Sequence, residues 1–101
     1  MARKNARNNE LLSSARPNVH TKVYELMLEL VNEDREDLAE AVYKIDNLLH
    51  MAVTCIRDRS FNEAKNTLSS VKNRLEGLKQ EGINTEYFDE IYEGLIKSIK
   101  K

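Results

Sequence analysis

The sequence contains few of the residues that stabilise small β-rich or disulfide-bonded domains. Its 101 residues include one cysteine, one proline, three glycines and no tryptophan. The lone Cys55 excludes a disulfide within the chain, and such sparse cysteine usage is typical of proteins from reducing compartments. Few glycines and prolines leave little material for the tight turns of a β-sheet protein. Because leucine, glutamate, lysine, alanine and asparagine dominate instead, the composition predicts an all-α protein.

Long apolar stretches are also missing. No apolar run approaches the roughly 20 residues that a membrane-spanning helix needs. The N-terminus lacks the apolar segment of a signal peptide. We therefore expect a cytoplasmic protein that has no membrane partner. Its small size, its single cysteine and its richness in asparagine and lysine favour a bacterial or phage source.

Metal-ligating residues are too few for the usual sites. The chain has one cysteine and two histidines, and neither His20 nor His50 follows a glutamate at a distance of three residues. Di-iron bundles use such glutamate–histidine pairs and zinc sites use cysteine and histidine clusters, so both classes of site are excluded. Acidic residues do gather between Glu33 and Glu40, where we interpret them as solvated acids at the start of a helix.

Catalytic motifs are equally scarce. His50 and Cys55 are five residues apart in a predicted helix, which separates them by about 140° around its axis and excludes a thiolate pair. The sequence has neither a glycine-rich phosphate loop nor a nucleophile elbow. We therefore predict a non-enzymatic protein with no catalytic residues, no cofactor, no metal and no small-molecule substrate.

Hydrophobic periodicity predicts a small antiparallel bundle of four helices behind a flexible basic arm. From Val19 onward, apolar residues recur every three or four positions, the spacing that lines one face of a helix. Gly82 suits the end of the third helix. The predicted helices span about 18–33, 35–58, 61–81 and 85–100, and the arm and the bundle domain span 1–17 and 18–101. Their predicted N-caps are Asn18, Asp34, Ser60 (in a capping box with Glu63), and Asn84 or Thr85.

The third and fourth predicted helices carry regular apolar stripes, which we expect to be buried. In the third helix the steps alternate between three and four residues, a pattern typical of a narrow coiled-coil-like contact. The expected stripes are Phe61, Ala64, Leu68, Val71, Leu75 and Leu78 in the third helix, and Phe88, Ile91, Tyr92, Leu95 and Ile99 in the fourth.

The boundary between the first two predicted helices is open. We expect a break near Asn32–Asp34, yet no glycine or proline separates the helices, and their apolar stripes are nearly in phase. A continuous helix over 19–57 is the alternative. At 1.5 Å per residue it would be about 58 Å long, too long for a compact monomer of this size, and it would favour a dimer.

Two surfaces on these helices are candidates for protein contacts. In the first helix, Tyr24, Leu28 and Val31 widen the apolar stripe beyond half the circumference, so we expect two helical neighbours or another subunit. On the second helix an aromatic, an acid and a histidine share a face opposite the core stripe, beside Ala39. That face is either an interface or an ordinary polar face. The candidate interface residues are Tyr24, Leu28, Val31, Tyr43, Asp46 and His50.

The N-terminal arm has three interpretations. It is a disordered tail whose charge aids solubility, a segment that contacts nucleic-acid phosphates, or a segment that docks on a protein through Leu11 and Leu12. It holds one acid, Glu10, and no aromatic residue for base stacking, and the segment that follows is acidic. The candidate nucleic-acid contacts are Arg3, Lys4, Arg7 and Arg16.

These observations favour a small protein-binding module, either a regulatory or adaptor protein or an inhibitor of a larger partner. The evidence for this interpretation is the surplus of apolar surface on the predicted helices. The partner is another protein or a second copy of this chain, and the sequence does not distinguish between them. The alternative is a nucleic-acid-binding protein that uses the basic arm, as a dimer.

Overall fold

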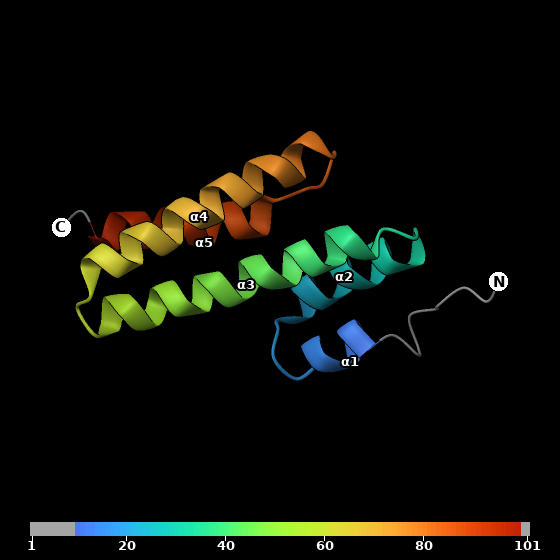
Figure 1. Ribbon diagram of the computed structural model, residues 1–101, viewed down its shortest axis with the longest axis horizontal. Helices are drawn as coiled ribbons and strands as arrows, with labels where there is room; N and C mark the ends of the chain where they lie inside the picture. Colours follow the sequence, from blue (N-terminus) through green and yellow to red (C-terminus); the bar gives the residue numbers. More distant parts are fainter. Residues whose placement is uncertain (1–9, 100–101) are drawn as a thin grey trace. The chain divides into compact units, whose positions relative to one another are not determined.

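The protein is all-α, as its composition predicts. The computed structural model describes residues 10–99, and in this part of the chain five helices and no strand are formed. Figure 1 shows the helices in chain order. They are α1 (Glu10–Ala15), α2 (Thr21–Asn32), α3 (Glu36–Arg57), α4 (Phe61–Gln80) and α5 (Glu86–Ile99). Four of them correspond to the predicted helices, and α1 is additional.

Helix α1 corrects the prediction of a wholly flexible arm over 1–17. Leu12 and Ala15, three residues apart, lie on one face of this short helix, where both are buried and the helix packs against α2. Asn18, the predicted N-cap of the next helix, instead closes α1, because its side-chain nitrogen donates to the Ser14 carbonyl at 2.8 Å. The N-cap of α2 is His20, whose Nδ1 accepts from the Lys22 amide at 3.0 Å.

The expected break between the first two predicted helices is confirmed at residues 33–35. Asp34 has a φ of 62°, and its amide donates to the Val31 carbonyl at 3.0 Å. The Arg35 amide donates to the Leu30 carbonyl at 2.8 Å. These two hydrogen bonds form a Schellman motif, which satisfies the last carbonyls of α2 and turns the chain back (Figure 1). Asp34 therefore ends α2 rather than capping α3, and the continuous helix is ruled out.

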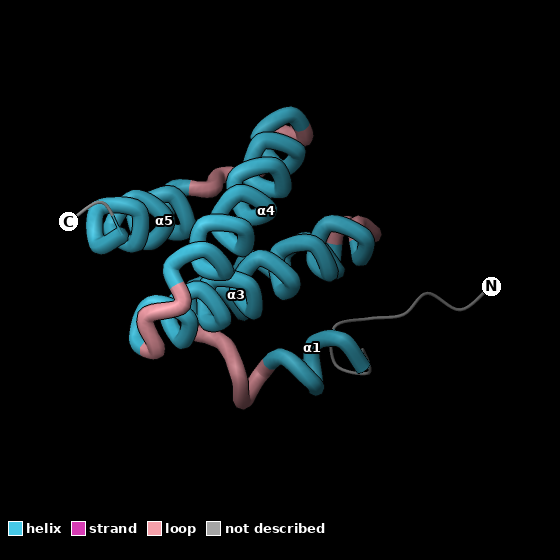
Figure 2. The backbone as a smooth tube through the Cα atoms, turned by 60° about the vertical axis from the view of Figure 1, so that its left-hand side comes forward, coloured by secondary structure: helices cyan, strands magenta, loops and turns pink. Residues whose placement is uncertain are grey.

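The described residues form two compact units, one up to Lys44 and one from Ile45 onward. The first unit contains α1, α2 and the start of α3. The second contains the remainder of α3 together with α4 and α5, and α4 packs against α5. Figure 2 shows the short loop, coloured pink, that joins α4 to α5.

Helix α4 supplies the most regular part of the buried surface in the second unit. Its predicted stripe is confirmed from Ala64 onward, in steps of four and three. Phe61, predicted to belong to this stripe, is instead 41% exposed at the first position of the helix. Ser60 is the N-cap as predicted, but with φ −87° and ψ 68° its side chain makes no capping hydrogen bond, so the capping box with Glu63 is not formed. The buried residues of α4 are Ala64, Leu68, Val71, Leu75 and Leu78.

Three helix ends use the same Schellman geometry with different residues at the left-handed position. Gly82 ends α4 with a φ of 80°, and Asp34 and Arg59 follow α2 and α3 with φ values of 62°. After α3, the Arg59 amide donates to the Ile56 carbonyl and the Ser60 amide donates to the Cys55 carbonyl. Only glycine occupies the left-handed region without a steric cost from Cβ.

We expect Arg59→Gly to stabilise the protein and Gly82→Ala to destabilise it, each by about 0.5–1 kcal/mol. Arg59 is exposed, so its replacement relieves the backbone without opening a cavity. A Cβ at Gly82 would meet no atom within 4 Å, so its cost is conformational rather than steric. Urea-induced unfolding measures both changes. Changes of the same sign in the two variants would contradict this account of the helix ends.

The hydropathy of the helices bears on membrane association. Within the described part of the chain, no helix combines the length and the apolar character needed to cross a bilayer.

Candidate functional site

Helix α5 presents an apolar face that the second unit covers incompletely. Phe88 is buried, with 1% of its surface exposed, and it is the one buried residue of this helix. The remaining apolar residues are half-buried, although α4 buries five residues of its own stripe. The sequence-based expectation of a fully buried stripe is therefore wrong for α5 beyond Phe88. The half-buried residues, which we call the α5 apolar face, are Ile91, Tyr92, Leu95, Ile96 and Ile99.

The width of this stripe explains why it is left uncovered. At about 100° per residue, the apolar side chains of α5 spread over about 140° of the helix circumference. Tyr92 lies toward α4, and Ile91 and Leu95 are displaced from it around the helix. Contact with one neighbouring helix buries a narrower stripe than this. The buried Phe88 lies in the middle of this range, so the apolar face points into the second unit, which covers it only in part.

Charges on the opposite side of α5 are ordered along the helix. Glu86 and Asp89 lie in the first turn, and Lys97 lies in the last. Glu90 and Glu93 are exposed between them. Acids near the N-terminus and a base near the C-terminus both complement the helix dipole. The side of α5 opposite the apolar face is thus negative at its start and positive at its end.

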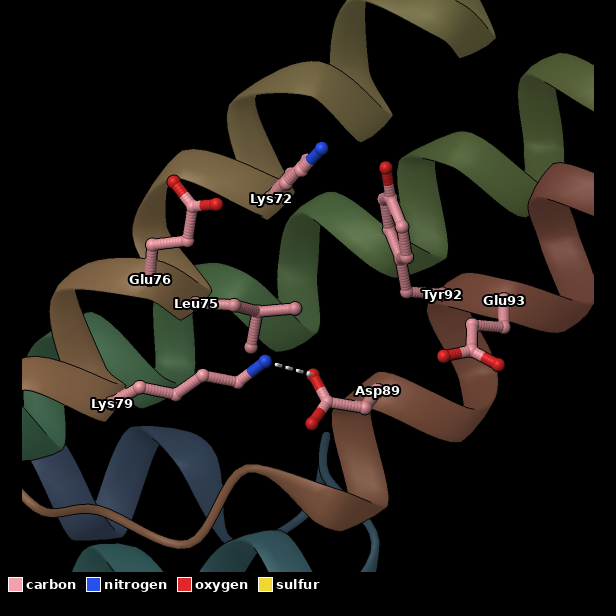
Figure 3. A pocket seen from close by; sticks show the side chains of 7 residues that line it. All are labelled: Lys72, Leu75, Glu76, Lys79, Asp89, Tyr92 and Glu93. Carbon is pink, nitrogen blue, oxygen red and sulfur yellow. Dashed lines mark ion pairs between the residues drawn. The ribbon is translucent and has the colours of Figure 1, made fainter.

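A shallow groove separates α4 from α5 (Figure 3). Across it, the Lys79 Nζ lies 3.4 Å from the Asp89 Oδ1, and Figure 3 shows Leu75 projecting from α4 toward α5. The groove has a volume of about 170 Å³. Pockets for small molecules usually hold roughly 300–1,000 Å³, so this groove is better understood as the junction of two packed helices. Its lining residues are Lys72, Leu75, Glu76, Lys79, Asp89, Tyr92 and Glu93.

Hydrogen bonds at the start of α5 hold this helix in place. The buried Thr85 donates from Oγ1 to the Asp89 Oδ2 at 2.9 Å, and the Glu86 amide donates to the Asn84 Oδ1 at 3.0 Å. Both residues proposed as N-caps from the sequence therefore take part in starting the helix. Asp89 is engaged by Thr85 on one oxygen and by Lys79 on the other, so its carboxylate serves the fold.

Asp46 contradicts the prediction of an outer face on α3. It is 4% exposed, and Ala39, expected beside that face, is fully buried. The Asp46 Oδ2 lies 3.2 Å from the His50 Nε2, which forms an ion pair when the imidazole is protonated. His50 itself is largely exposed, with 68% of its side chain accessible. The predicted outer face is therefore partly internal, with Ala39 and Asp46 buried and His50 exposed.

The pKa of the Tyr87 phenol is influenced by the same buried carboxylate, that of Asp46. Burial raises the pKa of its phenol above the usual value of 10.0, and the negative charge of Asp46 raises it further. The neutral phenol is thus favoured in the folded state. Its contribution to stability is fully present below pH 10 and is lost as the pH rises through the higher pKa of the folded protein.

We expect the free energy of unfolding of the wild type to fall more steeply above pH 10 than that of Tyr87→Phe, which has no phenol to ionise. Urea titrations at several alkaline pH values measure this difference, and tyrosinate absorbance identifies the transition that the variant loses. A difference between the two proteins that does not change with pH would contradict the expectation.

The other predicted interface residues are placed in the first unit. Val31 is buried within the chain, which argues against its role as an interface residue. Tyr24, Leu28 and Tyr43 are half-buried. The wide apolar stripe of α2 is thus covered in part, to the same degree as the apolar residues of α5 beyond Phe88.

The candidate nucleic-acid contacts fall mostly outside the described residues. Arg3, Lys4 and Arg7 precede residue 10, where the described residues begin. Arg16 is described, and it is exposed just after α1. Because the two buried residues of α1 pack against α2, the second half of the arm belongs to the fold. Residues 10–17 thus contribute one exposed arginine to any phosphate contact.

Residues 10–99 contain no group of three or more histidine, cysteine or acidic side chains that could hold a metal ion. Cys55 is a free, half-buried thiol on α3. The exposed large hydrophobic residues of the described chain, Met51, Val53 and Phe61, are not on α5. We take the α5 apolar face as the candidate functional surface because its half-buried residues are contiguous on one helix.

Comparisons with known proteins return no relative. No protein-family model matches the chain, and no curated protein and no solved structure matches it. The function is accordingly argued from the geometry of α5.

Proposed function

We propose that this protein is a non-enzymatic protein-binding module that acts through helix-mediated contacts, as a regulatory or adaptor protein or as an inhibitor. The observation that carries the proposal is the α5 apolar face, five half-buried aliphatic and aromatic residues on one side of one helix. Contiguous, incompletely covered apolar surface is typical of protein-interaction sites.

The chemistry of α5 favours a helical protein partner over a nucleic acid. An amphipathic helix binds by laying its apolar residues against those of its partner at three- and four-residue spacings. Glu86, Glu90 and Glu93 are exposed on the opposite side of the same helix, and negative charge repels a phosphate backbone. We further propose a cytoplasmic location and a bacterial or phage source, for which the composition is the support.

The test compares the wild type with Leu95→Glu, which places a charge within the α5 apolar face. Ser69→Glu is the matched control, because it adds the same charge at an exposed position of α4. Circular dichroism first establishes that the three proteins are equally helical. Each is then used to capture binding proteins, and every captured protein, together with a differently tagged copy of the chain itself, is purified and titrated.

We expect at least one of these proteins to bind the wild type and Ser69→Glu equally, and to lose binding to Leu95→Glu. A charge in the desolvated centre of an apolar contact typically reduces affinity more than 30-fold, roughly 2 kcal/mol or more. If every protein, the second copy included, bound all three variants alike, the proposal would fail. Capture of nucleic acid alone, sensitive to salt, would overturn it in favour of the basic arm.

A further inference from the structure

The second unit buries a carboxylate beside an accessible histidine. Asp46 of α3 is 4% exposed, and its Oδ2 lies 3.2 Å from the Nε2 of His50, one turn further along the same helix. The side chain of His50 is 68% exposed. Water therefore reaches the imidazole and exchanges protons with it, while the carboxylate beside it stays inside the protein.

The buried carboxylate also acts on helix α5. After burial, the negative charge of Asp46 is the second cause that raises the pKa of the Tyr87 phenol, so the carboxylate lies within electrostatic reach of this ring. Tyr87 meets Phe88 edge to face, and Phe88 is the one buried residue of α5. The charge of Asp46 is therefore buried beside the residues that hold α5 in the second unit.

We propose that His50 and Asp46 form a pH-sensitive latch that holds α5 in place. Burial of a carboxylate is costly unless an opposite charge compensates it. A protonated imidazole at 3.2 Å supplies that charge, and a neutral imidazole does not. In the unfolded chain both groups are in water, so protonation of His50 favours the folded state. The latch is independent of what binds the α5 apolar face.

The sign of the pH dependence follows from this pairing. The latch is closed while His50 is protonated, and its contribution to stability is lost as the pH rises through the range in which histidine gives up its proton. Lysine, tyrosine and carboxylate side chains ordinarily titrate outside about pH 5.5–7.5, and histidine titrates within it. Neutral pH should therefore loosen α5, and mild acid should hold it.

The charged groups of the neighbouring helices belong to the types that keep their charge over this range. Helix α5 contributes Tyr87, whose phenol ionises only above pH 10. Helix α4 contributes Lys72, Glu76 and Lys79, which line its contact with α5. Helix α3 itself contributes Arg57, exposed two turns beyond the histidine. The imidazole is therefore the group that changes the charge around Asp46.

The other histidine provides an internal control of opposite sign. His20 caps α2 in the first unit, where its Nδ1 accepts a hydrogen bond from the Lys22 amide at 3.0 Å. Protonation removes the lone pair that accepts this hydrogen bond. Acid should therefore weaken the start of α2, whereas it should strengthen the hold on α5.

The test is hydrogen exchange of the backbone amides of the full chain at about pH 5.5 and pH 7.5, with each rate corrected for the effect of pH on unprotected amides. We expect the α5 amides of the wild type to be about threefold more protected at the lower pH, the size expected of an ion pair with one exposed partner. His50→Gln and Asp46→Asn should each abolish this difference. His20→Gln should leave it unchanged and remove the pH dependence at the start of α2.

Three results would overturn the latch. One is an α5 difference that persists in His50→Gln, because another group would then be its source. Another is α5 protection that rises with pH in the wild type, because the sign would be reversed. The third is a difference lost in His50→Gln but kept in Asp46→Asn, because the imidazole would then act on another group. Since His50 is largely exposed, His50→Gln keeps the fold, and its comparison with the wild type is decisive even if Asp46→Asn does not fold.

Discussion

Replacing Phe88 with alanine is expected to lower the free energy of unfolding by about 3–5 kcal/mol. Phe88 is the largest fully buried side chain among the described residues, and no other residue of α5 is buried. The Tyr87 and Phe88 rings meet edge to face, with centroids 5.5 Å apart and planes inclined at 72°. The variant loses this apolar burial and leaves a cavity. Since a domain of this size is stable by only about 5–15 kcal/mol, the loss is a large part of the total.

Leu95→Ala is the control for this prediction. Leu95 lies on the same helix but is only half-buried, so its truncation should cost about 1 kcal/mol or less. Urea-induced unfolding measures both variants, and hydrogen exchange of the α5 amides shows whether the helix is released in Phe88→Ala. Equal losses in the two variants would contradict the assignment of Phe88 as the anchor of α5.

Anchoring through one residue has a consequence for binding. Phe88 holds the first half of α5, while three of the five residues of the α5 apolar face lie in the second half, from Leu95 onward. A partner that covers this face adds apolar burial to the part of the helix with the least of its own. We therefore expect a partner that binds this face to raise the unfolding midpoint of the second unit as the partner's concentration rises.

Leu12→Ala is expected to destabilise the first unit by about 2 kcal/mol, the lower end of the range for buried leucines, because α1 is a short terminal helix. Leu12 is 1% exposed, and α1 packs through it against α2. A flexible arm would predict no change. Hydrogen exchange of the α2 amides localises the effect, because loss of α1 uncovers the side of α2 on which it packs.

The neighbouring leucine supplies the matched control. Leu11 is half-buried in the same helix, and Leu11→Ala removes the same atoms from a more accessible position. It should cost clearly less than Leu12→Ala. If the two substitutions had the same small effect, α1 would contribute nothing to the fold, and the arm would be the flexible segment expected from its composition.

Local sequence patterns predicted most helices well because helices are stabilised by contacts a few residues apart. The bounds of α4 and α5 lie within a residue or two of the expected ones, since Ser60, Gly82 and Thr85 act at short range. The missed helix α1 has six residues, too few for a periodic pattern. Asp34 was expected to start a helix and instead ends one, because a single residue in the left-handed region does not need to be glycine.

The candidate site was harder to predict. The apolar stripe of α5 is plain in the sequence, and so is the order of its charges, but the sequence does not say how much of the stripe a neighbour covers. The opposite error was made for Asp46, which was predicted to lie on an exposed face and is only 4% exposed. Both errors concern coverage, which depends on the placement of other helices rather than on the residues of the helix itself.

The sequence by itself determined that this protein is all-α, where its main helices lie and which residues share a face. Those properties follow from backbone hydrogen bonding and side-chain periodicity within a few turns. Only the tertiary structure decided that Leu12 is buried, that Asp46 is internal and that α5 keeps an accessible apolar face. The physical reason is that burial is a property of two surfaces, and chain reversals at residues such as Asp34 and Gly82 decide which surfaces meet.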